Sequence, residues 1–211
     1  MIPSRKLRIY DTEFLNELMG HEIHLGLSKT NVHPLMIKYI QGYRNEISVY
    51  RMELLIESFR IFTNLVKQFS KDDCILFITK KREISNSIKK LAIDHHQYYM
   101  LGKWIPGLLT NFATYSKDIL NLYTKKQKNR KRVLTNTLGI SSMSKLPSLI
   151  IIIGLEGNST AIREAHKLNI PIVGFTSSRE DPKKVTYCIP SNLSSSKSMH
   201  FYLKLLQLSF K

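Results

Sequence analysis

The chain alternates short apolar runs with segments of helical periodicity. The clearest run is Cys74–Thr79 (CILFIT), a continuous apolar stretch typical of a strand buried on both faces. Strands of the same kind are predicted at Tyr98–Leu101, Leu149–Ile153, Pro171–Thr176 and Val185–Ile189. The last of these stands between two prolines, which indicates an edge strand. A further strand, Ile47–Val49, is expected to enter the same sheet.

Other segments carry apolar residues three or four positions apart, as the buried face of a helix requires. Helices are predicted over about Arg51–Phe69, Glu83–Asp94 and Ser198–Phe210, and from the capping residue Asn158 to about Leu168. The order of strand, helix and strand predicts βαβ units in a mostly parallel sheet of about five strands, with helices on both faces. We therefore expect an α/β fold, and the length suits one domain, residues 1–211.

The charge balance narrows the class of partner. Lys and Arg number 32 against 16 Asp and Glu, a formal net charge of +16. Such an excess destabilises a compact chain unless a polyanion neutralises it, and nucleic acid is the commonest polyanion. An anionic membrane is the alternative. It is disfavoured because the longest apolar run, Leu149–Gly154, is far shorter than the ~20 residues of a spanning helix.

Positive charge is concentrated in one segment. Ile119–Leu155 contains no acidic residue, and six basic residues fall within eight positions: Lys125, Lys126, Lys128, Arg130, Lys131 and Arg132. Like charges so close together repel one another, so something outside the segment must neutralise them. A solvated helix face or a flexible basic loop is the alternative. Together with the overall charge, the cluster favours contact with phosphates.

Three features raise the question of an enzyme. The loop Gly154–Ser159 lies between a strand and a helix, but it matches neither G-x-G-x-x-G nor the Walker pattern. Lys80-Lys81-Arg82 follows a strand and suits the phosphate oxygens of RNA or of a nucleotide. Ser194–Ser196 and Lys197 lack the spacing of a known nucleophile motif. We expect no catalytic residues, although a phosphate- or nucleotide-dependent α/β enzyme stays open at this point.

Cysteines and histidines do not predict a metal site. Cys74 and Cys188 are far apart, with no C-x-x-C spacing, and are expected to be buried free thiols of a reducing compartment. The histidine pairs His21/His24 and His95/His96 are not accompanied by further ligand residues at metal-binding spacing. We therefore expect neither a metal nor another cofactor, and no small-molecule substrate.

Three separated blocks of the chain are similar to the motifs of one known protein family. The first, Ile23–Gly26 with His33–Met36 and Gly42–Asn45, is similar to the family's V-H-F-G, N-P-K-M and G-x-R-N. The second, Lys103–Phe112, is similar to R-W-L-G-G-M-L-T-N-W. The third block is similar to A-I-K-E-A, L-G-I-P-V, D-P and I-P-G-N-D, at Ala161–Ala165, Leu168–Val173, Asp181-Pro182 and Ile189–Asn192. The blocks span nearly the whole chain in the order of the family that they resemble, the small-subunit ribosomal protein S2 family of bacteria and organelles.

The resemblance implies a flavodoxin-like three-layer α/β/α fold with a protruding helical hairpin after the second block. It implies ribosomal RNA and neighbouring ribosomal proteins as partners, a structural role in translation, and no catalysis. The basic cluster falls where the hairpin is expected, so residues 113–146 are interpreted as a shortened basic helical or loop insertion. Three positions depart from the family's usual Asp: Gly154, Ser177 and Leu193. Pro106 and Leu27 replace a usual Gly and His.

The location is expected to be mitochondrial. The drift from the family's motifs and the richness in Ile, Lys, Asn and Ser are typical of an A+T-rich organellar genome. Met1–Tyr10 is basic but has no apolar core, so it predicts no signal peptide and no good transit peptide, which fits synthesis inside the organelle. A plastid and the bacterial cytoplasm are the alternatives.

Binding is expected to rest on cations that meet RNA phosphates. The residues predicted to do so are Arg44, Lys80, Lys81, Arg82, Lys103, Lys125, Lys126, Lys128, Arg130, Lys131 and Arg132. Trp104 and Phe112 are expected to pack within the protein rather than stack on a base, with Trp104 as an anchor of its loop. A free-standing RNA-binding protein remains the second alternative to a ribosomal one.

Overall fold

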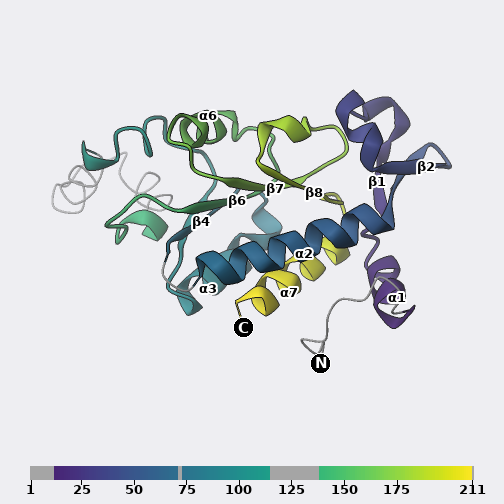
Figure 1. Cartoon of the computed structure of the whole chain (residues 1–211), viewed down its shortest axis with the longest axis horizontal. Helices are drawn as coiled ribbons and strands as arrows, with labels where there is room; N and C mark the ends of the chain where they lie inside the picture. The colour runs from purple at the N-terminus through teal and green to yellow at the C-terminus, as the bar shows by residue number, and fades with distance from the viewer. Residues whose placement is uncertain (1–11, 71–72, 115–137, 211) are drawn as a thin grey trace. The chain divides into compact units, whose positions relative to one another are not determined.

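The computed structural model describes residues 12–70, 73–114 and 138–210 (Figure 1). The chain divides into two compact units, which we call the terminal unit (residues 1–68 and 175–211) and the central unit (residues 69–174). Five strands form a parallel sheet in the order β5-β4-β6-β7-β8, and three form a separate antiparallel sheet in the order β1-β3-β2. Each unit is described by itself.

The central unit contains two βαβ crossovers. Its elements are β4 (Ile75–Thr79), α3 (Arg82–Asp94), β5 (Tyr98–Leu101), β6 (Leu149–Ile153), α6 (Ser159–Lys167) and the start of β7 (Ile172–Thr176). β4 pairs in parallel with β5 on one side and with β6 on the other. The two crossovers step in opposite directions along the sheet, and because such connections are right-handed, their helices lie on opposite faces. Figure 1 shows α6 on one face and α3 on the other.

Strands β4 and β6 are buried on both faces, as their unbroken apolar sequences predict. Every residue of β4 and β6 is buried, including Thr79 at the end of β4. The Thr79 hydroxyl donates a hydrogen bond to the backbone oxygen of Ile153 at 3.4 Å, so the polar group is satisfied inside the sheet.

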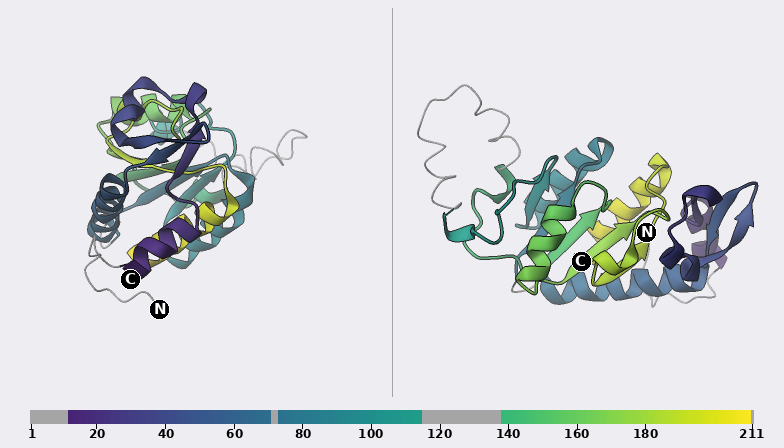
Figure 2. Two further views of the ribbon diagram at one scale, coloured as in Figure 1. Left: turned by 90° about the vertical axis from the view of Figure 1, so that its right-hand side faces the viewer. Right: turned by 90° about the horizontal axis from the view of Figure 1, so that it is seen from above.

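The terminal unit combines the small sheet with helices. Its elements are α1 (Thr12–Gly20), β1 (Leu25–Ser28), η1 (Lys29–Asn31), η2 (Pro34–Tyr39), β2 (Ile40–Arg44), β3 (Ile47–Tyr50), α2 (Met52–Phe69), η4 (Pro182–Lys184), β8 (Tyr187–Pro190) and α7 (Ser196–Ser209). α2 and α7 lie side by side (Figures 1 and 2). Their contact is aromatic: the ring of Phe59 lies 5.9 Å from that of Phe201 and 6.2 Å from that of Tyr202. Phe62 of α2 lies 5.3 Å from Phe175 of β7. These rings form the core of the unit.

The predicted fold class is confirmed: the chain is an α/β protein with a five-stranded parallel sheet flanked by helices. The edge strand before Pro190 is also confirmed as β8, the last strand in the sheet order. One strand was placed wrongly. Residues 47–50 form a strand, but β3 pairs antiparallel with β1 and β2 rather than entering the main sheet. Ser48 and Tyr50 form the buried face of β3. This alternation predicts a strand with one buried face, but it does not predict which strands pair with it.

The insertion predicted at residues 113–146 lies largely outside the described residues, and the single domain of residues 1–211 stays a prediction. In the part of the chain that the structure describes, no helix combines the length and the apolar character needed to cross a membrane.

Candidate nucleic-acid interface

The carboxyl ends of β4, β5 and β6 meet at one edge of the central unit, because the three strands run parallel. Lys80, Lys81 and Arg82 follow β4, and Lys103 follows β5. The backbone N–H of Gly102 donates to the oxygen of Thr79 at 2.9 Å and ties the two strand ends together. Four of the predicted RNA-binding residues are thus brought to one edge, which we call the carboxyl edge.

Lys80 is held across this edge. Its ammonium donates a hydrogen bond to the backbone oxygen of Gly157, in the loop between β6 and α6. Gly157 has a φ of +73°, and a Cβ built there would lie 2.5 Å from the Lys80 Nζ. The lysine therefore occupies space that only glycine leaves open. An ammonium has three N–H donors, so two others remain for an anion at the surface.

The loop that leads into α6 is a structured turn, as its sequence predicts. Asn158 stands at the helix N-cap and is fully buried, but its side chain does not cap the helix. Its Nδ2 donates instead to the backbone oxygen of Gly154 at 2.9 Å and closes the turn. The position of the predicted cap is confirmed, while the side chain stabilises the preceding loop rather than the helix end.

The loop after β5 is anchored by a buried carboxylate. Glu164 of α6 is only 6% exposed, and it accepts three hydrogen bonds from that loop. The donors are Trp104 Nε1 at 3.0 Å, Gly107 N at 2.7 Å and Leu109 N at 2.9 Å. Bonds from three N–H groups to one carboxylate are charge-assisted and fix the path of the chain. The loop that carries Lys103 is therefore rigid.

This anchor confirms the interpretation of Trp104 and identifies a residue that sequence reasoning missed. Trp104 is buried and points its only polar atom at Glu164, so it packs as a loop anchor and offers no face to a base. Phe112 is half-buried. Glu164 lies within the block Ala161–Ala165, whose sequence alone predicts no contact for it. The sequence feature that indicates its burial is its position directly before the apolar Ala165, on the buried face of a helix.

The remaining predicted cations lie elsewhere. Arg44 is exposed at the end of β2, in the terminal unit, where it pairs in register with Ile47. The cluster Lys125–Arg132 lies outside the described residues. The structure therefore brings together four of the eleven predicted residues, at the carboxyl edge.

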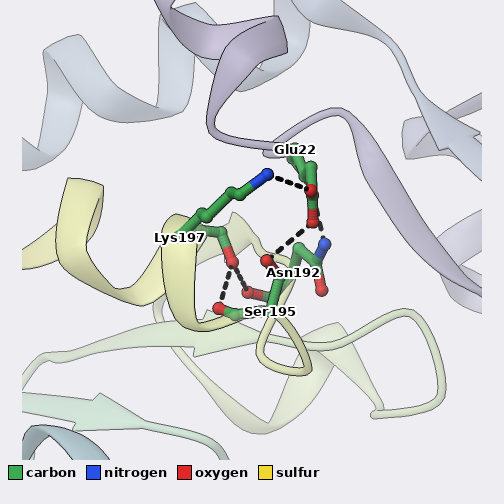
Figure 3. A network of polar contacts seen from close by, with 5 residues as sticks. Glu22, Asn192, Ser195 and Lys197 are labelled. Carbon is green, nitrogen blue, oxygen red and sulfur yellow. Dashed lines mark hydrogen bonds and ion pairs between the residues drawn. The ribbon is translucent and has the colours of Figure 1, made fainter.

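The serine-rich turn before α7 takes part in a network of hydrogen bonds in the terminal unit (Figure 3). The carboxylate of Glu22 accepts from Ser195 Oγ at 2.7 Å and from Lys197 Nζ at 3.0 Å, while Asn192 Nδ2 donates to the Glu22 backbone oxygen at 2.9 Å. The hydrogen bond from Ser195, and then Lys197, lower the pKa of the Glu22 carboxyl. Ser195 and Lys197 thus connect the start of α7 to the segment after α1 through hydrogen bonds to Glu22.

Comparison with known proteins decides the family. A sequence model described as "Ribosomal protein S2" matches residues 18–211. The chain belongs to the ribosomal protein S2 family. It is 30% identical to "Small ribosomal subunit protein uS2" of Wigglesworthia glossinidia brevipalpis over 217 residues, which cover 93% of this chain and 90% of that protein. It is also 30% identical to the protein of that name from Buchnera aphidicola subsp. Cinara cedri over 216 residues, covering 93% and 90%. The protein of that name from Desulfatibacillum aliphaticivorans is 31% identical over 198 residues, covering 84% and 67%.

Membership of the S2 family confirms the prediction of a structural, non-enzymatic ribosomal protein. At the positions where the S2 family resemblance implies Asp, Ser177 and Leu193 are buried. Within residues 12–70, 73–114 and 138–210, no group of three or more His, Cys, Asp or Glu side chains is arranged to hold a metal.

The two cysteines of this S2 family protein are free thiols, as predicted, although both are half-buried rather than fully buried. Burial raises the pKa of the Cys188 thiol above its ordinary value, so the neutral thiol is favoured.

Proposed function

We propose that the chain is a structural component of the small subunit of a mitochondrial ribosome, where it binds ribosomal RNA through the carboxyl edge. The relatives named "Small ribosomal subunit protein uS2" support the assembly, because their similarity extends over nearly the whole chain. The neighbours would be ribosomal RNA and other small-subunit proteins.

The observation that carries the RNA contact is the arrangement of Lys80, Lys81, Arg82 and Lys103 at one edge of the sheet. Phosphate oxygens suit these cations, and they fix the position of a protein on folded RNA without reading its sequence. The Glu164 anchor supports the same function, because a rigid loop presents Lys103 with less loss of side-chain and backbone freedom on binding.

The mitochondrial part of the proposal rests on divergence and composition. The similar proteins are bacterial and about 30% identical, and the chain is rich in Ile, Lys, Asn and Ser. Pro106 and Leu27 depart from the family's motifs in two of the three blocks. The bacterial cytoplasm is the alternative. Mass spectrometry of purified mitochondria and cytosol tests it: peptides of this chain in mitochondrial small subunits are expected, and their confinement to another compartment contradicts the proposal.

Sedimentation tests the ribosomal assembly. In a lysate gradient, the chain is expected to migrate with the small subunit at about 50 mM salt and to be released as salt rises to about 200 mM, because phosphate contacts release counterions. A chain that stays at the top of the gradient at low salt, while small subunits migrate, is a free-standing protein and not a ribosomal one.

A pair of double variants tests the carboxyl edge itself. R82Q/K103Q removes two exposed cations of the edge, whereas K89Q/K90Q removes two exposed cations of α3 beyond its first turn. Arg82 stands in the first turn of α3, where a positive charge is unfavourable, so its loss does not destabilise the helix. We expect weaker RNA binding for the first variant only. Equal weakening in both would indicate a general charge effect and contradict the assignment of the edge.

A further inference from the structure

The β2–β3 hairpin and the two short helices before it carry an unusual surface. Of the ten large hydrophobic side chains exposed among the described residues, four fall within positions 35–47. They are Leu35 (37% exposed), Ile37 (56%), Tyr43 (44%) and Ile47 (40%). Clustered exposed apolar groups of this kind mark binding surfaces rather than ordinary solvated surface. We call these four residues, with Lys29, Lys38 and Arg44, the hairpin surface.

The hairpin surface is also basic. Lys29, Lys38 and Arg44 are all exposed, and none of them forms an ion pair with a carboxylate in the described part of the chain. Between Ile23 and Met52 the only acidic residue is Glu46, in the hairpin turn. Positive charge that no carboxylate of the described residues pairs with fits an anionic ligand.

Two of these cations lie over aromatic rings. The Lys29 ammonium is 5.5 Å from the centre of the Tyr43 ring, and that of Lys38 is 4.7 Å from the centre of the Tyr39 ring. A cation–π contact holds the cation and the ring close together. A phosphate bound by Lys29 therefore brings its own base within reach of Tyr43.

The hairpin is built to hold this surface in place. Its two turn residues, Asn45 and Glu46, have φ angles of 47° and 62°, as the tightest hairpin turns require. Arg44 pairs with Ile47 across the strands, so the cation and an apolar side chain lie on one face next to the turn. Tyr43, one residue before Arg44, points to the opposite face of β2, and β2 is an edge strand of the small sheet, so a ligand that contacts both residues passes around this edge. Within the terminal unit, the small sheet lies beside the start of α2, which follows β3 directly (Figure 2).

We propose that the hairpin surface binds an unpaired segment of RNA, with a base stacked on Tyr43 and backbone phosphates contacting Lys29, Lys38 and Arg44. The proposal rests on the function proposed above and names a second contact, in the terminal unit. Unpaired RNA offers both base faces and phosphates, and proteins bind it through aromatic stacking combined with cations. Duplex RNA offers phosphates while its base faces stay stacked, so it leaves the exposed apolar residues without a partner. An acidic protein segment matches the cations but brings no flat face to Tyr43.

Binding of labelled RNA to the full-length chain tests the stacking. Y43A should weaken binding of a twelve-nucleotide uridine strand by roughly tenfold, the effect of losing one stacked base, and should change binding of a twelve-pair duplex less than twofold. Y43F keeps the ring and should bind as the original chain does. Y187A removes another exposed tyrosine of the terminal unit, on β8, and is the matched control. Equal affinity of Y43A and the original chain for the uridine strand overturns the proposal.

Salt dependence tests the cations. With about 0.7 counterions released per phosphate of a single strand, K29Q/K38Q/R44Q should reduce the slope of log affinity against log salt by about 2. An unchanged slope means that the three cations do not touch phosphates, and it overturns this part of the proposal.

Crosslinking in the assembled subunit separates this proposal from the proposed function. A photoreactive benzoylphenylalanine at position 43 should give an adduct with RNA that ribonuclease trims. If the chain sediments with small subunits but the adduct is with a protein, or no adduct forms, the hairpin proposal fails and the ribosomal function stands. If the chain does not sediment with small subunits, the proposed function itself fails.

Discussion

The indole nitrogen of Trp104 lies 3.0 Å from the carboxylate of Glu164, sixty residues further along the chain. The same carboxylate accepts from the backbone N–H groups of Gly107 and Leu109. A single buried side chain of α6 thus holds the loop after β5 through three bonds. The carboxylate satisfies donors that the loop could not satisfy alone, and the loop compensates a charge that would be costly to bury unpaired.

Two substitutions of Glu164 should destabilise the central unit to different extents. E164Q keeps one oxygen for Trp104 and Gly107 but turns an amide N–H₂ toward the Leu109 N–H, so about 2 kcal/mol of unfolding free energy should be lost. E164A leaves three donors without an acceptor and should cost about 4 kcal/mol. Urea unfolding measures both.

The control for this anchor is E83Q, at an exposed carboxylate in the first turn of α3, which should change stability by less than about 0.5 kcal/mol. W104F removes the indole N–H, so Glu164 keeps two of its three hydrogen bonds. Its loss of unfolding free energy should be larger than that of E83Q and smaller than that of E164A. If E164A is as stable as the original chain, the three bonds do not hold the loop.

The strands could be predicted because their apolar runs are continuous, as a parallel sheet with both faces covered requires. Ile75–Thr79 and Leu149–Ile153 have this property, and the structure pairs them in parallel. The small sheet could not be predicted, because β1 and β2 include Gly26, Gly42 and other residues with weak strand preference, and their pairing depends on the turn at Asn45.

The candidate site could be predicted only where charge follows a strand. Lys80 follows β4, as its place after an apolar run predicts, and Lys103 follows β5 at the same edge because parallel strands share a carboxyl edge. The burial of Glu164 could not be predicted, because an acidic residue in a short helix normally faces water. Its burial depends on the hydrogen bond from Trp104, and no local sequence pattern predicts that these two residues, sixty positions apart, are in contact.

A pH-dependent contribution to stability is expected from Glu22. Its carboxyl has a lowered pKa in the folded chain, chiefly because Ser195 and then Lys197 donate hydrogen bonds to the ionised form. The bonds therefore contribute fully above the ordinary pKa of 4.5, and the contribution is lost as pH falls through the lower folded-state value. The urea midpoint of the original chain should exceed that of E22Q at pH 7, and the gap should close toward pH 3.

Salt provides the control for Glu22. The ion pair with Lys197 is exposed, so 1 M salt should narrow the gap at pH 7 while the bond from Ser195 persists. A gap between the original chain and E22Q that stays constant from pH 7 to pH 3 would show that ionisation of Glu22 plays no part.

Substitution of Gly157 should lower both the stability of the protein and its affinity for RNA. G157A places a Cβ where the Lys80 ammonium lies and forces an L-residue to a φ of +73°, which should cost about 1–2 kcal/mol. Displacement of Lys80 should also weaken RNA binding at the carboxyl edge. G20A is the matched control, since a Cβ there meets nothing within 4 Å. Loss of stability with unaltered RNA affinity would mean that Lys80 reaches its phosphate from either position.

The basic cluster should govern incorporation into the subunit. Two triple variants divide it, K125Q/K126Q/K128Q and R130Q/K131Q/R132Q. If these cations neutralise phosphates of duplex RNA, each triple should reduce the salt slope by about 2.7, at about 0.9 counterions per phosphate. Each should also lower the fraction of the chain that sediments with small subunits at about 150 mM salt. Six like charges in eight positions repel one another, so either triple should leave the free protein as stable as before or more stable.

The control for the cluster removes three exposed cations from the helices of the central unit, K89Q/K90Q/K167Q, and leaves the net charge equal to that of either triple. If incorporation depends on local phosphate contact, this control should sediment as the original chain does, because net charge alone sets only the long-range attraction, which salt of about 150 mM screens beyond about 8 Å. If the control is released as readily as the two triples, the excess charge acts as a whole and the cluster has no contact of its own. Stability gained without loss of incorporation would instead assign the cluster to a solvated face.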